Sequence, residues 1–228
     1  MKVYYRLCGI ASTNPSPILQ DDKYKLNELC YRSFIANLDS DVPIHVIADK
    51  ADIKECERLV SLRGNTSIIH TDMGINDTCL YQYSLAKDCT DDEVILFQEC
   101  DYFYNDEVSK LEKATKILGL CSPYDHLNFY QDSNLHSDYC QIKLINNHHW
   151  RSVERNTMTF AIRGDLFKKY YDIFYQYGYL DGDVWYDLLD AGQTLWTPIP
   201  SIATHMVKNW LAPTIDWKTK FAQYEAQI

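Results

Sequence analysis

The chain has 228 residues, of which 46% are hydrophobic and 24% are charged, and its formal net charge is −10. This length is sufficient for a substantial core in one large domain or two small ones. Because an acidic chain lacks the basic face that binding to a phosphate backbone requires, we expect no nucleic-acid partner.

The chain contains eight cysteines, and none of them forms a Cys-x-x-Cys pair. Scattered cysteines of this kind behave as small hydrophobes, so they indicate a reducing compartment and no disulfide framework. The N-terminal stretch MKVYYRLCGI lacks the apolar run of a signal peptide. No run of about 18 apolar residues occurs, so we predict no membrane span and a soluble, cytoplasmic protein.

Strand and helix signals alternate through the first half of the chain. Short apolar runs predict strands, and apolar residues at helical spacing predict helices. The expected strands are 3–8, 44–48, 67–70 and 94–97, and the expected helices are 21–38, 53–60, 77–87 and 106–118. Asn105 is the predicted N-cap of the last helix. The alternation predicts an α/β fold with a doubly wound sheet, in which ligands bind beyond the carboxyl ends of the strands.

The second half is less regular. We expect residues 119–150 to form loops around one or two strands. A strand over 157–162, a helix over 165–177, a short helix ending at Gly192 and a strand over 195–199 follow. Because no linker or repeat separates these elements, the sequence predicts a single domain.

Charged side chains follow several of the expected strands. Arg6, Asp49 and Asp72 each lie near a strand end, and Glu99 and Asp101 end the run VILFQECDYFY. Because the carboxyl ends of parallel strands meet at one edge of a sheet, we expect these side chains to face one crevice. Two carboxylates at i and i+2 provide the hard oxygen ligands that Mg²⁺ and Mn²⁺ prefer. Taken alone, so short a pattern is more often a solvated strand end.

A second acidic cluster changes this assessment. Asp181 and Asp183 precede a short helix, which is followed by a glycine, a strand, two prolines and His205. The order of these features over residues 3–206 resembles that of inverting, nucleotide-sugar-dependent glycosyltransferases with the GT-A fold, including small viral and bacterial enzymes. The resemblance implies a Rossmann-type mixed sheet flanked by helices. Residues 1–104 would form a nucleotide-binding half and residues 105–228 an acceptor-binding half.

The resemblance also implies an activity. The enzyme would move a sugar from a nucleoside-diphosphate sugar, with a UDP-sugar favoured, to a hydroxyl of a glycan or another acceptor, with inversion. The cofactor would be Mn²⁺ or Mg²⁺, held by Asp101, Glu99 and His205. Asp183 would be the general base, with Asp181 as its rival, because the Glu-Asp pair of the family is Gly182-Asp183 in this sequence.

The same resemblance assigns Asp49 to the base or ribose of the donor nucleotide. We expect Arg6 and Asp72, with Glu99 and Asp101, to contact the nucleotide as well because they face the same crevice. The middle residue of the Glu99–Asp101 motif is Cys100, a poor ligand for a hard cation, and we expect its side chain to point away.

Five other side chains are candidates for a binding role or for a structural one. Trp150 is a candidate for stacking on a sugar, and Asp125 is a weak candidate for sugar binding. Arg151 and Arg155 are either phosphate contacts or solvated charges. His70, which follows a strand, is more readily explained as a core residue.

Two rival functions remain open at this point. A sugar-phosphate nucleotidyltransferase also has an α/β sheet and a carboxylate-bound metal, but it opens with a glycine-rich loop and a basic residue, and CGIASTNPSP has a single glycine. A non-catalytic sugar-binding protein on the same fold would tolerate Cys100 within the metal motif.

Overall fold

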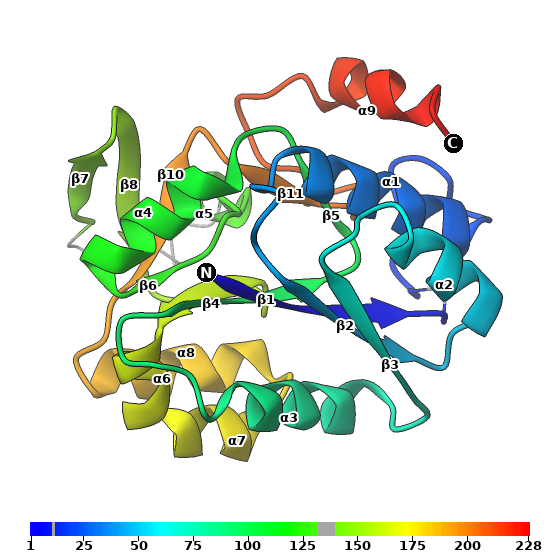
Figure 1. The fold of residues 1–228 in the computed structure, drawn as a ribbon. Helices are drawn as coiled ribbons and strands as arrows, with labels where there is room; N and C mark the ends of the chain where they lie inside the picture. The colour runs from blue at the N-terminus through cyan, green and yellow to red at the C-terminus, as the bar shows by residue number, and fades with distance from the viewer. Residues whose placement is uncertain (11, 132–139) are drawn as a thin grey trace.

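The computed structural model describes residues 1–10, 12–131 and 140–228. A nine-stranded mixed sheet forms the centre of the molecule, with helices on both faces (Figure 1). In spatial order its strands are β3 (Thr66–Thr71), β2 (Ile44–Asp49), β1 (Lys2–Cys8), β4 (Val94–Glu99), β9 (Phe160–Arg163), β6 (Leu120–Cys121), β10 (Leu195–Ile199), β8 (His148–Val153) and β7 (Ile142–Ile145). The strands from β3 to β4 are parallel, whereas β9 is antiparallel to both of its neighbours.

Two groups of helices cover the sheet (Figure 1). One face carries α1 (Lys23–Ala36), α2 (Ile53–Val60), α4 (Val108–Leu118) and α9 (Trp217–Glu225), and the other carries α3 (Ile75–Ala86), α6 (Gly164–Lys169), α7 (Tyr171–Tyr177) and α8 (Asp181–Asp190). The short α5 (Asn128–Gln131) lies outside these two groups. The predicted α/β architecture is therefore confirmed, and because β4 pairs with β9, both halves of the chain contribute to one sheet.

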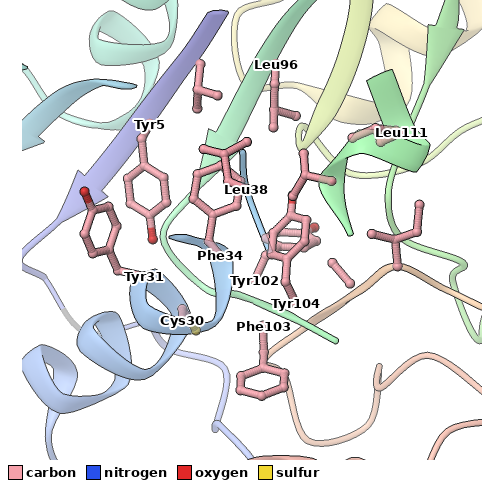
Figure 2. Close-up of a cluster of buried hydrophobic side chains, with 14 of the residues drawn as sticks. Tyr5, Cys30, Tyr31, Phe34, Leu38, Leu96, Tyr102, Phe103, Tyr104 and Leu111 are labelled. Carbon is pink, nitrogen blue, oxygen red and sulfur yellow. The ribbon is translucent and has the colours of Figure 1, made fainter. Parts of the chain in front are cut away.

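A two-stranded sheet completes the fold. β5 (Tyr102–Tyr104) pairs antiparallel with β11 (Ala203–His205), although about a hundred residues separate them in the sequence. Figure 2 shows Tyr104 of β5 beside Phe34 of α1, whereas Phe103 points the other way, where it packs against Phe221 of α9. The rings of Phe34 and Tyr104 are 5.0 Å apart, and those of Tyr5 and Tyr31 are 5.3 Å apart with their planes at 85°. Such pairs contribute about 0.5–1.5 kcal/mol beyond their burial, so the Phe34–Tyr104 contact helps to fix β5 against α1.

Three local predictions were wrong. The helix expected over 165–177 is divided at Tyr170 into α6 and α7. The N-cap of α4 is Glu107. Asn105 instead donates its side-chain N–H groups to the backbone carbonyls of Ser201 and Ile202, and so joins the two segments that flank the small sheet. The strand expected over 157–162 begins only at Phe160.

The described residues contain no disulfide bond and no helix that could span a membrane. All eight cysteines are free. Within residues 1–10, 12–131 and 140–228, no helix offers the long apolar stretch that crossing a bilayer would take.

Candidate active site

The sheet contains a topological switch point between β1 and β4. The chain passes from β1 to β2 and β3 through α1 and α2 on one face, and then returns to β4 through α3 on the opposite face. Helices on opposite faces leave a crevice at the carboxyl ends of the two central strands, which is where ligands bind in open α/β sheets. The parallel register sets Arg6 beside Glu99 at this point.

Three neighbouring cavities open along this edge. The first cavity, about 420 Å³, lies at the ends of β1, β2 and β4 and has a largely apolar lining. The central cavity, about 220 Å³, shares Ser12, Glu99 and Asp101 with the first. The third cavity, about 180 Å³, shares Thr157, Asp181 and Trp210 with the central one. Shared walls make these cavities one continuous row.

The pairing of β5 with β11 brings Asp101 and His205 together in the central cavity. The register sets His205 beside Tyr102, and the two rings stack in parallel 4.9 Å apart. Nε2 of His205 donates to Oδ2 of Asp101 at 3.2 Å. Burial alone would raise the pKa of Asp101, but His205, with smaller effects from Lys23 and a backbone N–H group, holds that pKa well below its usual range. Burial would lower the pKa of His205, but Asp101 outweighs it and raises that pKa.

These two side chains fit a divalent cation. Two ligand atoms at about 2.1 Å from one ion, on adjacent octahedral positions, lie about 3 Å apart, which matches the Asp101–His205 separation. Nδ1 of His205 is buried without a hydrogen-bond partner among the described residues, so the ring is placed by stacking and by its contact with Asp101. In the part of the chain that the structure describes, no group of three or more His, Cys, Asp or Glu side chains is arranged to hold an ion. A cation here would therefore complete its shell with water and substrate oxygens, as Mg²⁺ and Mn²⁺ commonly do.

Glu99 lines the same cavity, but an arginine already engages its carboxylate. Nη2 of Arg6 donates to Oε1 of Glu99 at 2.5 Å, and Nη1 of Arg6 donates to the carbonyl of Ile75 at 3.1 Å. Burial raises the pKa of Glu99, and Arg6 opposes this effect. The structure thus brings all three predicted metal residues together, with Asp101 and His205 in contact and Glu99 bound to a cationic side chain.

Asp49 and Asp72 have different positions. The carboxylate of Asp49 accepts hydrogen bonds from the Thr71 hydroxyl and from the backbone N–H groups of Met73 and Gly74. It fastens the turn that leads into α3, and it also lines the first cavity. Asp72 is 89% exposed and faces Lys50 at 3.8 Å, and it is absent from the lining of the three cavities.

Only one of the two candidate bases on α8 lines the row of cavities. Asp181 lines both the central and the third cavity, and burial by their walls raises its pKa. Both side chains are exposed to solvent, but Asp183 contributes to none of the three cavity linings. Its charge instead contributes to the raised pKa of Tyr177, after the larger effects of a hydrogen bond to Asp187 and of burial. The geometry therefore favours Asp181 over Asp183.

The third cavity contains two further groups. Arg155 and the half-buried His126 line it together with Trp210, whose side chain is 36% exposed. Burial, with smaller effects from the nearby His205 and Arg155, lowers the pKa of His126 to about 4, so its ring is neutral at physiological pH. A neutral imidazole, a guanidinium and an open indole face provide polar and stacking contacts beside Asp181.

One cationic side chain at the site was not anticipated from the sequence. Lys23, in the first turn of α1, lines the first cavity and directs Nζ toward Sγ of Cys100 at 3.7 Å. Sγ of Cys100 also accepts from the backbone N–H of Cys8 at 3.5 Å. Cys100 is thus turned toward β1 and α1, and it is absent from the lining of the central cavity, in line with the expectation that it points away from the metal site.

Several other sequence candidates have structural roles. Trp150 is fully buried, so the prediction that it stacks on a sugar is wrong. Nη2 of Arg151 donates to Oδ1 of Asp125 at 2.6 Å in the protein interior, so these two candidates are paired with each other. His70 is exposed on the edge strand β3, so the expectation of a core residue was also wrong. Arg155 alone among them reaches the row of cavities.

Comparison with known proteins identifies the type of fold. No family model and no curated protein sequence matches the chain. The galactosyltransferase LgtC, solved with donor and acceptor sugar analogues, is similar over 86% of this chain and 73% of its own, with a TM-score of 0.52 and 12% identity. Mouse xyloside xylosyltransferase 1 is similar over 86% and 84%, with a TM-score of 0.50 and 6% identity.

A third solved structure has a different activity. The 4-diphosphocytidyl-2C-methyl-D-erythritol synthase of Anaerococcus prevotii covers 99% of this chain and 96% of its own, with a TM-score of 0.53 and 11% identity. At such identities the likeness is one of fold. The chain therefore has the GT-A-like, Rossmann-type mixed sheet that glycosyltransferases and nucleotidyltransferases share.

Proposed function

We propose that this protein is a metal-dependent glycosyltransferase that moves a sugar from a nucleoside-diphosphate sugar, with a UDP-sugar favoured, to a hydroxyl of a glycan or similar acceptor. One observation carries the proposal. Asp101, His205 and Asp181 line a single central cavity, and that cavity joins a larger apolar one at the β1–β4 switch point to a third one at Trp210. The row provides places for a nucleotide, a reacting centre and an acceptor, in that order.

The side chains divide the work by position. The first cavity, with its apolar walls and Asp49, would take the base and ribose of the donor. Asp101 and His205 would hold Mn²⁺ or Mg²⁺, which when bound supplies the positive charge that stabilises a diphosphate leaving group. Glu99, paired with Arg6, would orient donor hydroxyls at the mouth of the central cavity.

Asp181 would act as the general base. It is reachable from solvent and from the third cavity, and its raised pKa makes its carboxylate a better proton acceptor. An acceptor sugar stacked on Trp210 would present its hydroxyl to this carboxylate. A base that acts opposite the diphosphate predicts inversion at the anomeric carbon, which proton NMR of the first-formed product tests directly.

A donor screen tests the proposal as a whole. The protein is incubated with Mn²⁺ and a panel of UDP-, GDP- and CMP-linked sugars, and thermal shift and slow donor hydrolysis are followed. We expect a metal-dependent shift and hydrolysis with one donor, and loss of both in the Asp101→Asn variant. If no nucleotide sugar binds with or without metal, the proposal is wrong.

The nearly complete overlap with the Anaerococcus prevotii synthase supports a second candidate, a nucleotidyltransferase. Such an enzyme releases pyrophosphate when it is given a nucleoside triphosphate and a sugar phosphate. Pyrophosphate release from UTP or CTP, without transfer from any nucleotide sugar, would favour this candidate. Metal-dependent nucleotide binding without any turnover would favour a non-catalytic binding protein.

A further inference from the structure

Lys23 lies at the wall between two cavities. It lines the first cavity, and it also lines a fourth one of about 180 Å³, here called the loop cavity, which is formed by residues 12–16 and 19–21 together with Lys23, Leu26, Asp101, Met206 and Val207. Asp101 lines both cavities as well. Lys23, from α1, and the predicted cation ligand Asp101, which follows β4, thus line the same two cavities.

The other charged groups around the first cavity have close partners. Arg6 binds Glu99 and a backbone carbonyl, and the carboxylate of Asp49 accepts from one hydroxyl and two backbone N–H groups. Lys50 faces Asp72 across 3.8 Å. Arg6 and Asp49 are therefore engaged by protein atoms, whereas Lys50 and Asp72 form only a solvent-exposed pair.

Lys23 differs from them. Among the described residues the hydrogen-bond acceptor of its Nζ atom is Sγ of Cys100, at 3.7 Å, and no described carboxylate forms an ion pair with it. A thiol is a weak acceptor, and an ammonium group that is partly withdrawn from water gains much more from an anionic partner. Lys23 is therefore a strong donor at the first cavity whose best partner would be an anion.

We propose that Lys23 binds the diphosphate of the nucleotide as a second positive charge beside the cation held by Asp101 and His205. The inference rests on the proposed function, since it requires a nucleotide in the first cavity. A phosphate oxygen that replaces Cys100 as the partner of Nζ would gain a charge-assisted hydrogen bond. The diphosphate would then be bound from two sides, by the lysine from α1 and by the metal from the β5–β11 sheet.

Two charges of separate origin have a measurable consequence. If the metal were the whole counter-charge, a chelator would abolish the binding of a nucleoside diphosphate. With Lys23 in place, we expect the wild-type protein to keep weaker but measurable binding of UDP in EDTA. The affinity of the wild-type protein for uridine, which has no phosphate, is expected to be independent of both charges.

The test is isothermal titration of wild-type protein, Lys23→Met, Lys23→Arg and the control Lys25→Met with UDP and uridine, each with Mn²⁺ and with EDTA. Lys25 is exposed on the same helix turn, so the control removes an equal charge from solvent. We expect Lys23→Met to weaken UDP binding about tenfold or more, to abolish it in EDTA, and to leave uridine binding unchanged. Lys23→Arg should restore part of the loss, and Lys25→Met should resemble wild type.

The possible failures are distinguishable. UDP binding by Lys23→Met that equals wild type in both buffers overturns the role of Lys23 and leaves the proposed function intact. An equal loss of UDP and uridine binding also overturns it, because the substitution would then have damaged the cavity and not a phosphate contact. Wild-type protein that binds neither UDP nor GDP, ADP or CDP overturns the proposed function and this inference together.

Discussion

Two acid–base pairs near the carboxyl edge of the sheet differ in what surrounds them. Asp125 is 1% exposed, and its carboxylate accepts from Arg151 at 2.6 Å and from the Tyr130 hydroxyl at 2.6 Å. Asp101 accepts from His205 at 3.2 Å, and its side chain is 25% exposed to the row of cavities. The first pair is closed off by protein, whereas the second faces open space.

The comparison distinguishes charged groups that stabilise the fold from charged groups that are able to bind a ligand. A buried carboxylate whose oxygens are occupied by protein donors holds the fold together and has little capacity left for a ligand. A carboxylate that faces a cavity and has a single side-chain partner can share its free oxygen lone pairs with a cation or a substrate. Asp181 and Lys23 belong with the second kind, because both line cavities and neither is enclosed by an opposite charge.

The largest effect is expected at the open site. Asp181→Asn should lower the transfer rate about 10²- to 10⁴-fold, the range typical of removing a general base, with little change in thermal stability. Asp183→Asn, the matched neighbour on the same helix turn, should transfer at nearly the wild-type rate. Initial rates at saturating donor, together with melting temperatures, measure this. The reverse order of the two variants would return the role of base to Asp183.

The closed pair should respond in the opposite way. Arg151→Met leaves the Asp125 carboxylate buried without its counter-charge, and such a loss costs about 3–5 kcal/mol. Urea unfolding should show this loss, and adding Asp125→Asn to the same chain should recover part of it. A loss below about 1 kcal/mol for Arg151→Met would mean that water reaches this pair and that the contrast with Asp101 is incorrect.

Within the Glu99-Cys100-Asp101 motif, we expect Mn²⁺ affinity to depend on Asp101 and much less on Glu99. Asp101→Asn and His205→Gln should each weaken Mn²⁺ binding in the presence of UDP by at least about 10- to 100-fold, a loss that even outer-shell partners of metal sites produce. Glu99→Gln should keep Mn²⁺ affinity close to wild type, because its amide oxygen still accepts from Arg6. Titration followed by Mn²⁺ electron paramagnetic resonance distinguishes the three. Equal losses in all three variants would make Glu99 a direct ligand.

The smallest effect is expected at Cys100. Its side chain is 5% exposed and is turned toward Cys8 and Lys23, so Cys100→Ser should leave Mn²⁺ affinity unchanged and cost about 1 kcal/mol of stability. Cys100→Asp, by contrast, would give Lys23 a carboxylate partner and should weaken UDP binding while sparing the metal. A large loss of Mn²⁺ affinity in Cys100→Ser would contradict this orientation.

The elements of the first half could be predicted because each has a local cause. β1, β2, β3 and β4 begin and end within two residues of the apolar runs that predict them. The three-residue strands β5 and β11 have no such signal, since neither forms without the other. Their pairing brings His205 to Asp101, and beside it the Asn105 side chain donates to the carbonyls of Ser201 and Ile202.

Asp181 and Lys23, which both line the row of cavities, share one signal in the sequence. Asp181 precedes the buried Val184, Trp185 and Leu188 by three, four and seven positions, and Lys23 stands in the same relation to Leu26 and Cys30. Residues at this spacing lie on one face of a helix, whereas Asp181 and Asp183 are about 200° apart. In both α1 and α8, the charged residue lies in the first turn on the face of the helix that packs against the protein, and it lines a cavity.

The sequence by itself determined the α/β class, the order of strands and helices in the first half, and the acidic ends of the strands that lead to the site. These follow from local hydrophobic periodicity, which needs no partner from elsewhere in the chain. Only the tertiary structure decided that Asp101 meets His205, that Arg6 occupies Glu99, and that Asp181 faces the cavity in place of Asp183. Each of these depends on the pairing of segments far apart in the sequence or on the rotation of a helix against the sheet, and packing of the whole core sets both.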